Sequence, residues 1–258
     1  MADKGEKLSI LILLLLGLVQ GLCDFLPISS SGHLVLLSRL FGASDSLFVS
    51  IVLHIATLLS LVIVMRKEVF YLIRHPFSKE AMSIVITTII TCVVTIVLMP
   101  LISASFEGAF LPISFLLSAI LLFVSQKLNR NDGKVNFKRA SIIGLAQGFA
   151  IFPGLSRSGT TITAGMISGA SKEESTRFSF LISLPIVVGS LILEIVKIFI
   201  YKEPISVNWL GLAFSFIVAF IAGILTIKFM LNLTKKLNFK YFAYYLIVLA
   251  IVSAIFLW

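Results

Sequence analysis

The stretch GLVQGLCDFLPISSSGH, residues 17–33, places one carboxylate, three serines and a histidine directly after an apolar run. That run, Leu8–Cys23, is too short and too broken to cross a hydrocarbon layer of ~30 Å comfortably. A second short apolar piece, Leu34–Phe41, follows the polar residues. Irregular backbone at membrane depth is tolerated only where protein or water covers it. The stretch therefore predicts two half-helices that enter and leave a membrane on the same side.

A second copy of this stretch, GLAQGFAIFPGLSRSGT, occupies residues 144–160, and every position lies 127 residues after its counterpart without a gap. Apolar runs flank it as well, Ser141–Phe152 and Thr161–Ile167. The identical positions outside the apolar residues are the pairs Gly17/Gly144, Gln20/Gln147, Gly21/Gly148, Ser29/Ser156, Ser31/Ser158 and Gly32/Gly159. Chance similarity of apolar runs would match leucines, not glutamine, serine and glycine in one register. The sequence therefore predicts an internal repeat.

The composition indicates that lipid surrounds the chain. Of its 258 residues 59% are hydrophobic and only 13% are charged, against about 25% charged residues in a typical soluble domain. Six further apolar runs are close to the length of a membrane span: Leu47–Met65, Met82–Ala104, Ala109–Gln126, Phe178–Ile200, Trp209–Met230 and Tyr241–Trp258. We expect an all-α integral membrane protein with six transmembrane helices plus two re-entrant helix-loop-helix segments.

Each repeat unit consists of one broken segment followed by three spans, about 8–126 and about 140–258 of a single membrane domain, 1–258. Because three is odd, the second unit is inverted relative to the first. Inverted repeats with interrupted helices usually place their binding site at the repeat interface, near the bilayer midplane. We therefore expect the tips of the two broken segments to meet there.

The net charge of +9 is distributed unevenly rather than spread as in a nucleic-acid-binding surface. If both broken segments are re-entrant, most basic residues outside the spans share one side of the membrane. They are Arg66, Lys67, Arg74, Lys79, Lys127, Arg130, Lys134, Lys138, Arg139, Lys172, Arg177, Lys235, Lys236 and Lys240. Only Lys4, Lys7, Arg39 and Lys202 would lie on the other side. This positive-inside bias predicts cytoplasmic basic loops and both termini outside.

The positions at which the two copies differ suggest chemistry. Asp24 corresponds to Ile151, Ser30 to Arg157 and His33 to Thr160. An arginine inside a membrane segment is costly and by default functional. Its planar guanidinium suits phosphate oxygens. Arg157 therefore predicts a phosphate-bearing ligand, although pairing with Asp24 for structure alone stays an alternative.

The serine-rich tips can each begin a short helix, with Ser29 or Ser156 as the N-cap. Free N–H groups at such helix starts bind anions. Ser29, Ser31, Ser156 and Ser158 are expected to hold backbone and phosphate, and Gly159 to admit a ligand close to the backbone. Ser30 has no serine counterpart in the second copy, which makes it the favoured nucleophile.

Three further side chains complete the candidate site. His33 could act as base, acid or nucleophile. Asp24 could orient His33, act as a base or hold a divalent cation. Gln20 lies one helical turn before Asp24 and could bind a ligand or water. For each residue a structural role, as a cap or as a buried hydrogen-bonding group, remains open.

The segments QGLCDFLPISSSGHL and PGLSRSGTT resemble the two signature segments of the membrane undecaprenyl-diphosphate phosphatases, the bacitracin-resistance family. The resemblance extends over the whole chain. The matching residues are Gln20, Ser29, Ser30, His33, Pro153, Gly154, Ser156, Arg157, Ser158, Gly159 and Thr161. Asp24 stands where the family has glutamate, and its side chain is one methylene shorter.

The resemblance implies an enzyme of the bacterial cytoplasmic membrane that removes the terminal phosphate of undecaprenyl diphosphate. The product, undecaprenyl phosphate, is the carrier that cell-wall synthesis uses again. The family is similar to metal-dependent phosphatases, which implies Mg²⁺ or Ca²⁺, here held by Asp24 with Gln20. The expected catalytic residues are Asp24, Ser30, His33 and Arg157. Gln20, Thr161 and the tip serines would bind substrate.

Two other functions fit the same sequence features. Inverted repeats and broken helices are also the architecture of transporters, so a flippase of a polyprenyl phosphate lipid is an alternative. A structural membrane subunit would tolerate alanine at Asp24, Ser30, His33 and Arg157 together. The sequence leaves the oligomeric state open, with a homodimer among the alternatives.

Overall fold

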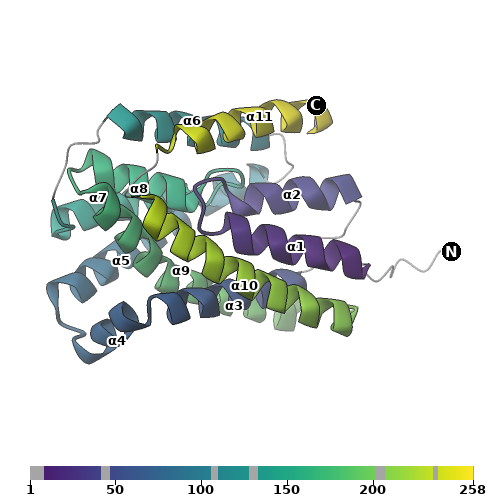
Figure 1. Ribbon diagram of the computed structural model, residues 1–258, viewed down its shortest axis with the longest axis horizontal. Helices are drawn as coiled ribbons and strands as arrows, with labels where there is room; N and C mark the ends of the chain where they lie inside the picture. Colours follow the sequence, from purple (N-terminus) through teal and green to yellow (C-terminus); the bar gives the residue numbers. More distant parts are fainter. Residues whose placement is uncertain are drawn as a thin grey trace.

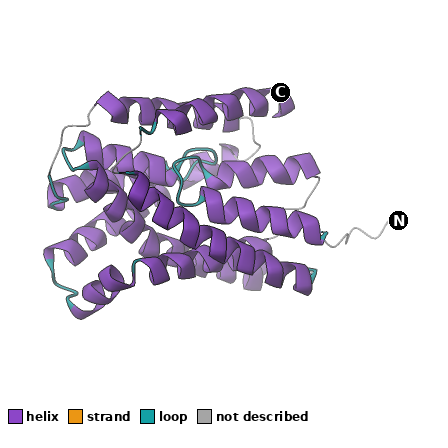
Figure 2. Cartoon of the chain, in the orientation of Figure 1, coloured by secondary structure: helices purple, strands orange, loops and turns teal. Residues whose placement is uncertain are grey.

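The computed structural model describes residues 9–41, 47–105, 110–127, 133–201, 207–234 and 238–257. Eleven helices, α1 to α11, and the turns between them make up these ranges, in which no strand is present (Figure 2). The predicted all-α class is therefore confirmed. Six basic residues, Lys4, Lys7, Arg130, Lys202, Lys235 and Lys236, lie outside the described residues. So do Leu8, the start of the first broken segment, and the predicted span ends Ala109 and Trp258.

Both copies of the repeated stretch form a helix, a turn and a second helix. In the first copy α1 (Ile10–Cys23) precedes α2 (Ser30–Phe41), and in the second α7 (Phe137–Phe149) precedes α8 (Arg157–Ile167). The two helices of each pair pack against each other. Figure 1 shows the turn between α1 and α2 in the middle of the molecule, whereas α1 begins at its periphery.

All six predicted spans coincide with helices. These helices are α3 (Leu47–Val64), α5 (Lys79–Ser105), α6 (Leu111–Lys127), α9 (Lys172–Tyr201), α10 (Trp209–Leu233) and α11 (Lys240–Leu257). Three of them, α5, α9 and α10, are long and apolar enough to cross a membrane by themselves. The shorter α6 and α11 pack along each other.

A basic loop was expected after the first span, but the structure has a helix there, α4 (Arg66–Arg74). It follows α3 at a bend of 82°, and counting this bent pair as one span raises the number of membrane-crossing candidates to four. None of its residues is buried, and Phe70 and Tyr71 are exposed beside the basic side chains. The charged residues of α4 interrupt the apolar pattern from which the other helices were predicted, and for this reason α4 was not predicted.

The repeated glycines mark the places where helices cross closely. α1 packs along α10, and α7 packs along α5. A Cβ atom on Gly17 would stand 2.4 Å from the Ser215 carbonyl oxygen, and one on Gly144 would stand 2.8 Å from that of Thr87. The hydroxyls of Ser215 and Thr87 donate to carbonyls of α1 and α7 at 2.6 and 3.0 Å. Small residues with hydroxyl partners are a typical means of close helix packing in membranes.

The turn after α1 is fixed by an apolar core. Phe25 is 2% exposed and packs edge-on against Phe180 of α9, with ring centroids 5.6 Å apart. Ile28 and Leu36 belong to the same cluster, which also takes residues from α6, α8, α10 and α11. The apolar residues between Asp24 and Ser29 therefore hold the polar ones in place.

Candidate active site

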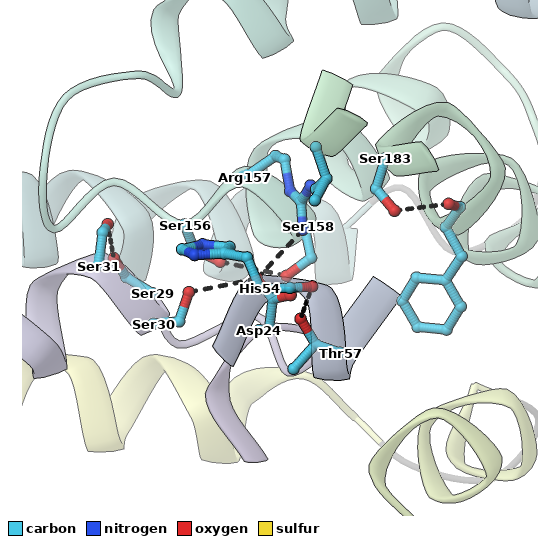
Figure 3. A network of polar contacts seen from close by, with 12 residues as sticks. Asp24, Ser29, Ser30, Ser31, His54, Thr57, Ser156, Arg157, Ser158 and Ser183 are labelled. Atoms are coloured by element: carbon cyan, nitrogen blue, oxygen red, sulfur yellow. Dashed lines mark hydrogen bonds and ion pairs between the residues drawn. The ribbon is translucent and has the colours of Figure 1, made fainter. Parts of the chain in front are cut away.

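The two tips meet, although Asp24 and Arg157 lie 133 positions apart in the sequence. The Arg157 guanidinium donates from Nη2 to Asp24 Oδ1 at 3.3 Å. Beside it, Ser158 Oγ donates to the Leu26 carbonyl oxygen at 2.9 Å. Figure 3 shows the contact between Arg157 and Asp24, which joins the start of α8 to the turn after α1. Each copy of the repeated stretch thus supplies one half of a single polar site.

One carboxylate oxygen, Asp24 Oδ1, is the common hydrogen-bond acceptor of this site. Ser30 Oγ donates to Asp24 Oδ1 at 3.3 Å, so the serine hydroxyl and the Arg157 guanidinium share the same acceptor (Figure 3). The Asp24 side chain is 8% exposed and that of Arg157 20%. A buried carboxylate needs such a charged partner. The arrangement puts a hydroxyl beside a proton acceptor and a guanidinium beside the hydroxyl.

The starts of α2 and α8 face this site with capped helix ends. Ser156 Oγ accepts from the Gly159 N–H at 3.1 Å, and Ser29 Oγ accepts from the Gly32 N–H at 3.3 Å. The first N–H groups of a helix have no partner within it, and they carry the positive end of the helix dipole. Two such ends at one site favour an anionic ligand.

Ser29 has an unusual backbone. Its φ of 67° is in the left-handed region, which residues other than glycine seldom adopt, whereas its counterpart Ser156 has a φ of −69°. Strain of this kind persists only where the surroundings hold it, and it clusters at functional sites. The first tip is therefore held in a conformation that the second does not need.

A pocket opens between the tips and encloses about 270 Å³, its open mouth included. Seven of the predicted site residues line it: Asp24, Ser29, Ser30, Ser31, Ser156, Arg157 and Ser158. Cys23, Ala150 and Leu155 complete the described lining. Four predicted residues, Gln20, His33, Gly159 and Thr161, are not among the lining residues that the structure describes.

Gln20 does not line the described pocket and is fully buried. Within the described residues neither its amide oxygen nor its amide nitrogen has a hydrogen-bond partner. Its counterpart Gln147 donates to Thr91 Oγ1 at 3.1 Å, but α10 presents Ala219 at the equivalent crossing. An unpaired buried amide costs free energy, so Gln20 is a group that a ligand or a water molecule could satisfy.

Thr161 and Gly159 serve the fold of α8 rather than the pocket wall. Thr161 Oγ1 donates to the Arg157 carbonyl oxygen at 2.8 Å and lies 2.6 Å from Ser179 Oγ on α9. Gly159 supplies the N–H that Ser156 caps. Both residues fix the start of α8 and with it the position of Arg157.

His33 is directed toward α11. Its Nδ1 lies 2.7 Å from the Ser29 carbonyl oxygen, and its Nε2 lies 2.7 Å from the Tyr245 hydroxyl. Because a carbonyl oxygen only accepts, Nδ1 carries the ring proton and Nε2 accepts from the tyrosine. The ring is buried. His33 thus supports the carbonyl of the strained Ser29, while Asp24 is the group that contacts Ser30.

Two supporting residues, Tyr245 and Ser118, were not predicted from the sequence. Ser118 Oγ on α6 accepts from the Ser156 N–H at 2.9 Å and donates to the Gly154 carbonyl oxygen at 3.2 Å. Tyr245 lies 127 positions after Ser118, which is the offset of the repeat. Each residue supports one tip from an apolar helix. The offset was the signal that could have found them.

The donor atoms at the site match the ligands that Mg²⁺ and Ca²⁺ prefer, which are oxygens. Asp24 provides a carboxylate, Ser29 and Ser30 provide hydroxyls, and Gln20 has an unpaired amide oxygen one turn away. Within the described residues no three His, Cys, Asp or Glu side chains cluster as a metal site. A cation here would therefore need phosphate oxygens of a ligand as further partners, as is usual for Mg²⁺.

The fold and the site define a class: a multi-pass, all-helical membrane protein whose two helix pairs build one polar pocket. A model of one family, described as bacitracin resistance protein BacA, matches residues 13–252. The chain therefore belongs to the BacA family. This confirms the resemblance that the two motifs indicated.

Curated relatives are similar to this chain over nearly the full length of both sequences. A protein of Carboxydothermus hydrogenoformans named undecaprenyl-diphosphatase is 34% identical, over 92% of this chain and 94% of the relative. One of Shouchella clausii, named undecaprenyl-diphosphatase 1, is 37% identical over 96% and 97%. One of Bacteroides thetaiotaomicron, named undecaprenyl-diphosphatase, is 36% identical over 90% and 93%.

Proposed function

We propose that this protein is an undecaprenyl-diphosphatase: it hydrolyses undecaprenyl diphosphate to undecaprenyl phosphate and inorganic phosphate. The reaction returns the lipid carrier to cell-wall synthesis. The names of the relatives support this activity. The observation that carries it is that Ser30 and Arg157 share Asp24 Oδ1 between the starts of two helices.

Arg157 and the two helix starts bind the diphosphate in this proposal. The guanidinium can form two parallel hydrogen bonds to phosphate oxygens, and it offsets the charge that develops during phosphoryl transfer. The N–H groups at the starts of α2 and α8, with the hydroxyl of Ser156, bind the remaining oxygens, while Ser158 holds the two tips together. The apolar helices accommodate the polyprenyl chain.

Ser30 is the proposed nucleophile. Its Oγ attacks the terminal phosphorus while its proton passes to Asp24, and the bond from that phosphorus to the bridging oxygen breaks. Undecaprenyl phosphate leaves, and a phosphoserine remains. Water then attacks the phosphoserine, which releases inorganic phosphate and restores the Ser30 hydroxyl as Asp24 returns the proton. His33 contributes by holding the carbonyl of Ser29, the residue directly before Ser30 at the start of α2.

Asp24, with Gln20 nearby, would hold a divalent cation, Mg²⁺ or Ca²⁺, together with the diphosphate. When bound, that ion would neutralise part of the phosphate charge. The unpaired, fully buried amide of Gln20 supports this assignment.

The proposed membrane arrangement has six spans and two re-entrant segments, related as inverted repeats of about 8–126 and 140–258. The equivalent packing of α1 on α10 and of α7 on α5 supports it. In Figure 1 α1 begins and α11 ends at the right of the molecule, while α4 and α7 lie at the left. With the positive-inside rule, the end that carries α4 is cytoplasmic, and both termini lie outside, in the bacterial cytoplasmic membrane.

The test is phosphate release from undecaprenyl diphosphate by the purified protein in detergent. We expect release by the wild type and its loss in Arg157→Ala. Arg66→Ala, on the exposed face of α4, is the matched control and should leave the rate unchanged. A wild-type protein that binds the lipid without releasing phosphate would instead support a flippase. Unchanged release in Arg157→Ala would overturn the proposed role of the pocket.

A further inference from the structure

The hydrogen bond between Tyr245 and His33 joins the last helix of the chain to the first tip. The two residues lie 212 positions apart, and the Tyr245 hydroxyl is 2.7 Å from His33 Nε2. Their rings are stacked at an interplanar angle of 10°, with centroids 5.7 Å apart. Phe115 of α6 packs edge-on against the same imidazole at 6.0 Å. The imidazole thus has little freedom to rotate.

The fixed imidazole acts on the strained part of the tip. Its Nδ1 donates to the carbonyl oxygen of Ser29, the residue whose φ of 67° is rare for serine. A strained backbone needs contacts that hold it. Ser30 follows directly and donates its hydroxyl to Asp24. A continuous series of hydrogen bonds therefore runs from Tyr245 through His33 to the turn that directs Ser30.

We propose that Tyr245 is a positioning residue of the phosphatase reaction: its hydroxyl bonds to Nε2 and holds the His33 ring in place, and the ring in turn holds the Ser29 turn and so directs Ser30 at Asp24. Tyr245 itself does not line the pocket that the structure describes. Ser118 supports the second tip from the equivalent position of α6, so both tips are held by a hydroxyl from outside the repeated stretches. The proposal rests on the proposed function of the Ser30 site.

The adjacent tyrosine provides a matched control. Tyr244 lies on the same helix, is 55% exposed against 42% for Tyr245, and packs edge-on against Phe123 instead of His33. Tyr245→Phe and Tyr244→Phe remove the same atom from neighbouring positions. We expect Tyr245→Phe to lower kcat about three- to tenfold, the effect of one lost hydrogen bond, with KM changed less than about twofold. Tyr244→Phe should change neither constant.

A double-mutant cycle with His33→Ala tests whether Tyr245 acts through the imidazole. Adding Tyr245→Phe to His33→Ala should cause no further loss of kcat. Independent, additive losses would overturn the proposal, as would equal kcat values for Tyr245→Phe and Tyr244→Phe.

A second readout does not depend on catalysis. The chain has three histidines, so the ring-nitrogen NMR signals of His33 can be assigned by comparison with His33→Ala. The wild type should show a neutral ring protonated at Nδ1, and Tyr245→Phe should shift the Nε2 signal while Tyr244→Phe does not. If the wild type releases no phosphate but this shift occurs, the proposed reaction fails and the contact stands. If the wild type is active and the signals are identical in both variants, the positioning role fails.

Discussion

Arg157 Nη2 lies 3.3 Å from Asp24 Oδ1, although the two residues are 133 positions apart. Neither charge is stable by itself in an apolar interior, and each sits at the tip of one copy of the repeated stretch. The ion pair therefore requires both tips to reach the same depth. Since Ser30 donates to the same carboxylate oxygen, the pair also places the proposed nucleophile.

The charge of residue 24 should matter more than its length. We expect Asp24→Asn to lower phosphate release at least about 100-fold, because it removes the proton acceptor of Ser30 and leaves Arg157 without its charged partner. Asp24→Glu introduces the glutamate expected at this position from the family resemblance, and its kcat/KM should stay within about tenfold of the wild-type value. The measurement is kcat/KM in detergent. Equal activity of Asp24→Asn and wild type would remove Asp24 from the mechanism.

Replacing Ser30 should separate binding from chemistry. Ser30→Ala should lose phosphate release while the diphosphate lipid still binds, because Arg157 and the helix starts remain. Ser141→Ala is the control, since Ser141 is only half-buried, is not among the described lining residues of the pocket and donates to its own helix. Rapid quenching with substrate labelled at the terminal phosphate should trap label on Ser30 of the wild type. Label on another residue, or full activity of Ser30→Ala, would exclude this nucleophile.

Removing divalent cations should slow the reaction. We expect a chelator to lower phosphate release at least about tenfold, because the site supplies one carboxylate and a diphosphate must be neutralised. Activity should return on addition of Mg²⁺ or Ca²⁺. Gln20→Ala should raise the cation concentration needed for half-maximal rate. Full activity after exhaustive chelation would mean that Arg157 and the helix starts suffice.

Close helix crossing at Gly17 predicts a stability effect unrelated to catalysis. Gly17→Ala places a methyl group 2.4 Å from the Ser215 carbonyl oxygen, so α1 and α10 must separate. Overpacking of this kind costs about 1–3 kcal/mol, which should appear as a lower Tm in detergent. Gly189→Ala is the control, because a Cβ there meets nothing within 4 Å. A Tm unchanged by Gly17→Ala would contradict the packing.

The helices and the repeat could be predicted because both are visible as residue patterns within short segments of the sequence. Apolar runs of span length predicted six helices, and identical glycines, glutamines and serines at one offset predicted the paired tips. The helix α4 was missed because its charges hide it among loop residues. Tyr245 was missed because a tyrosine in an apolar run, here beside Tyr244, resembles a residue that faces lipid.

The sequence by itself determined that Asp24, Ser30 and Arg157 belong to two matching tips, because the repeat relates their positions. Only the tertiary structure decided which atoms meet: one oxygen of Asp24 receives both Ser30 and Arg157, and His33 faces Tyr245. The physical reason is that such contacts depend on how each helix is rotated and how deeply each tip reaches. Those quantities are set by packing between helices far apart in the chain, which no local pattern records.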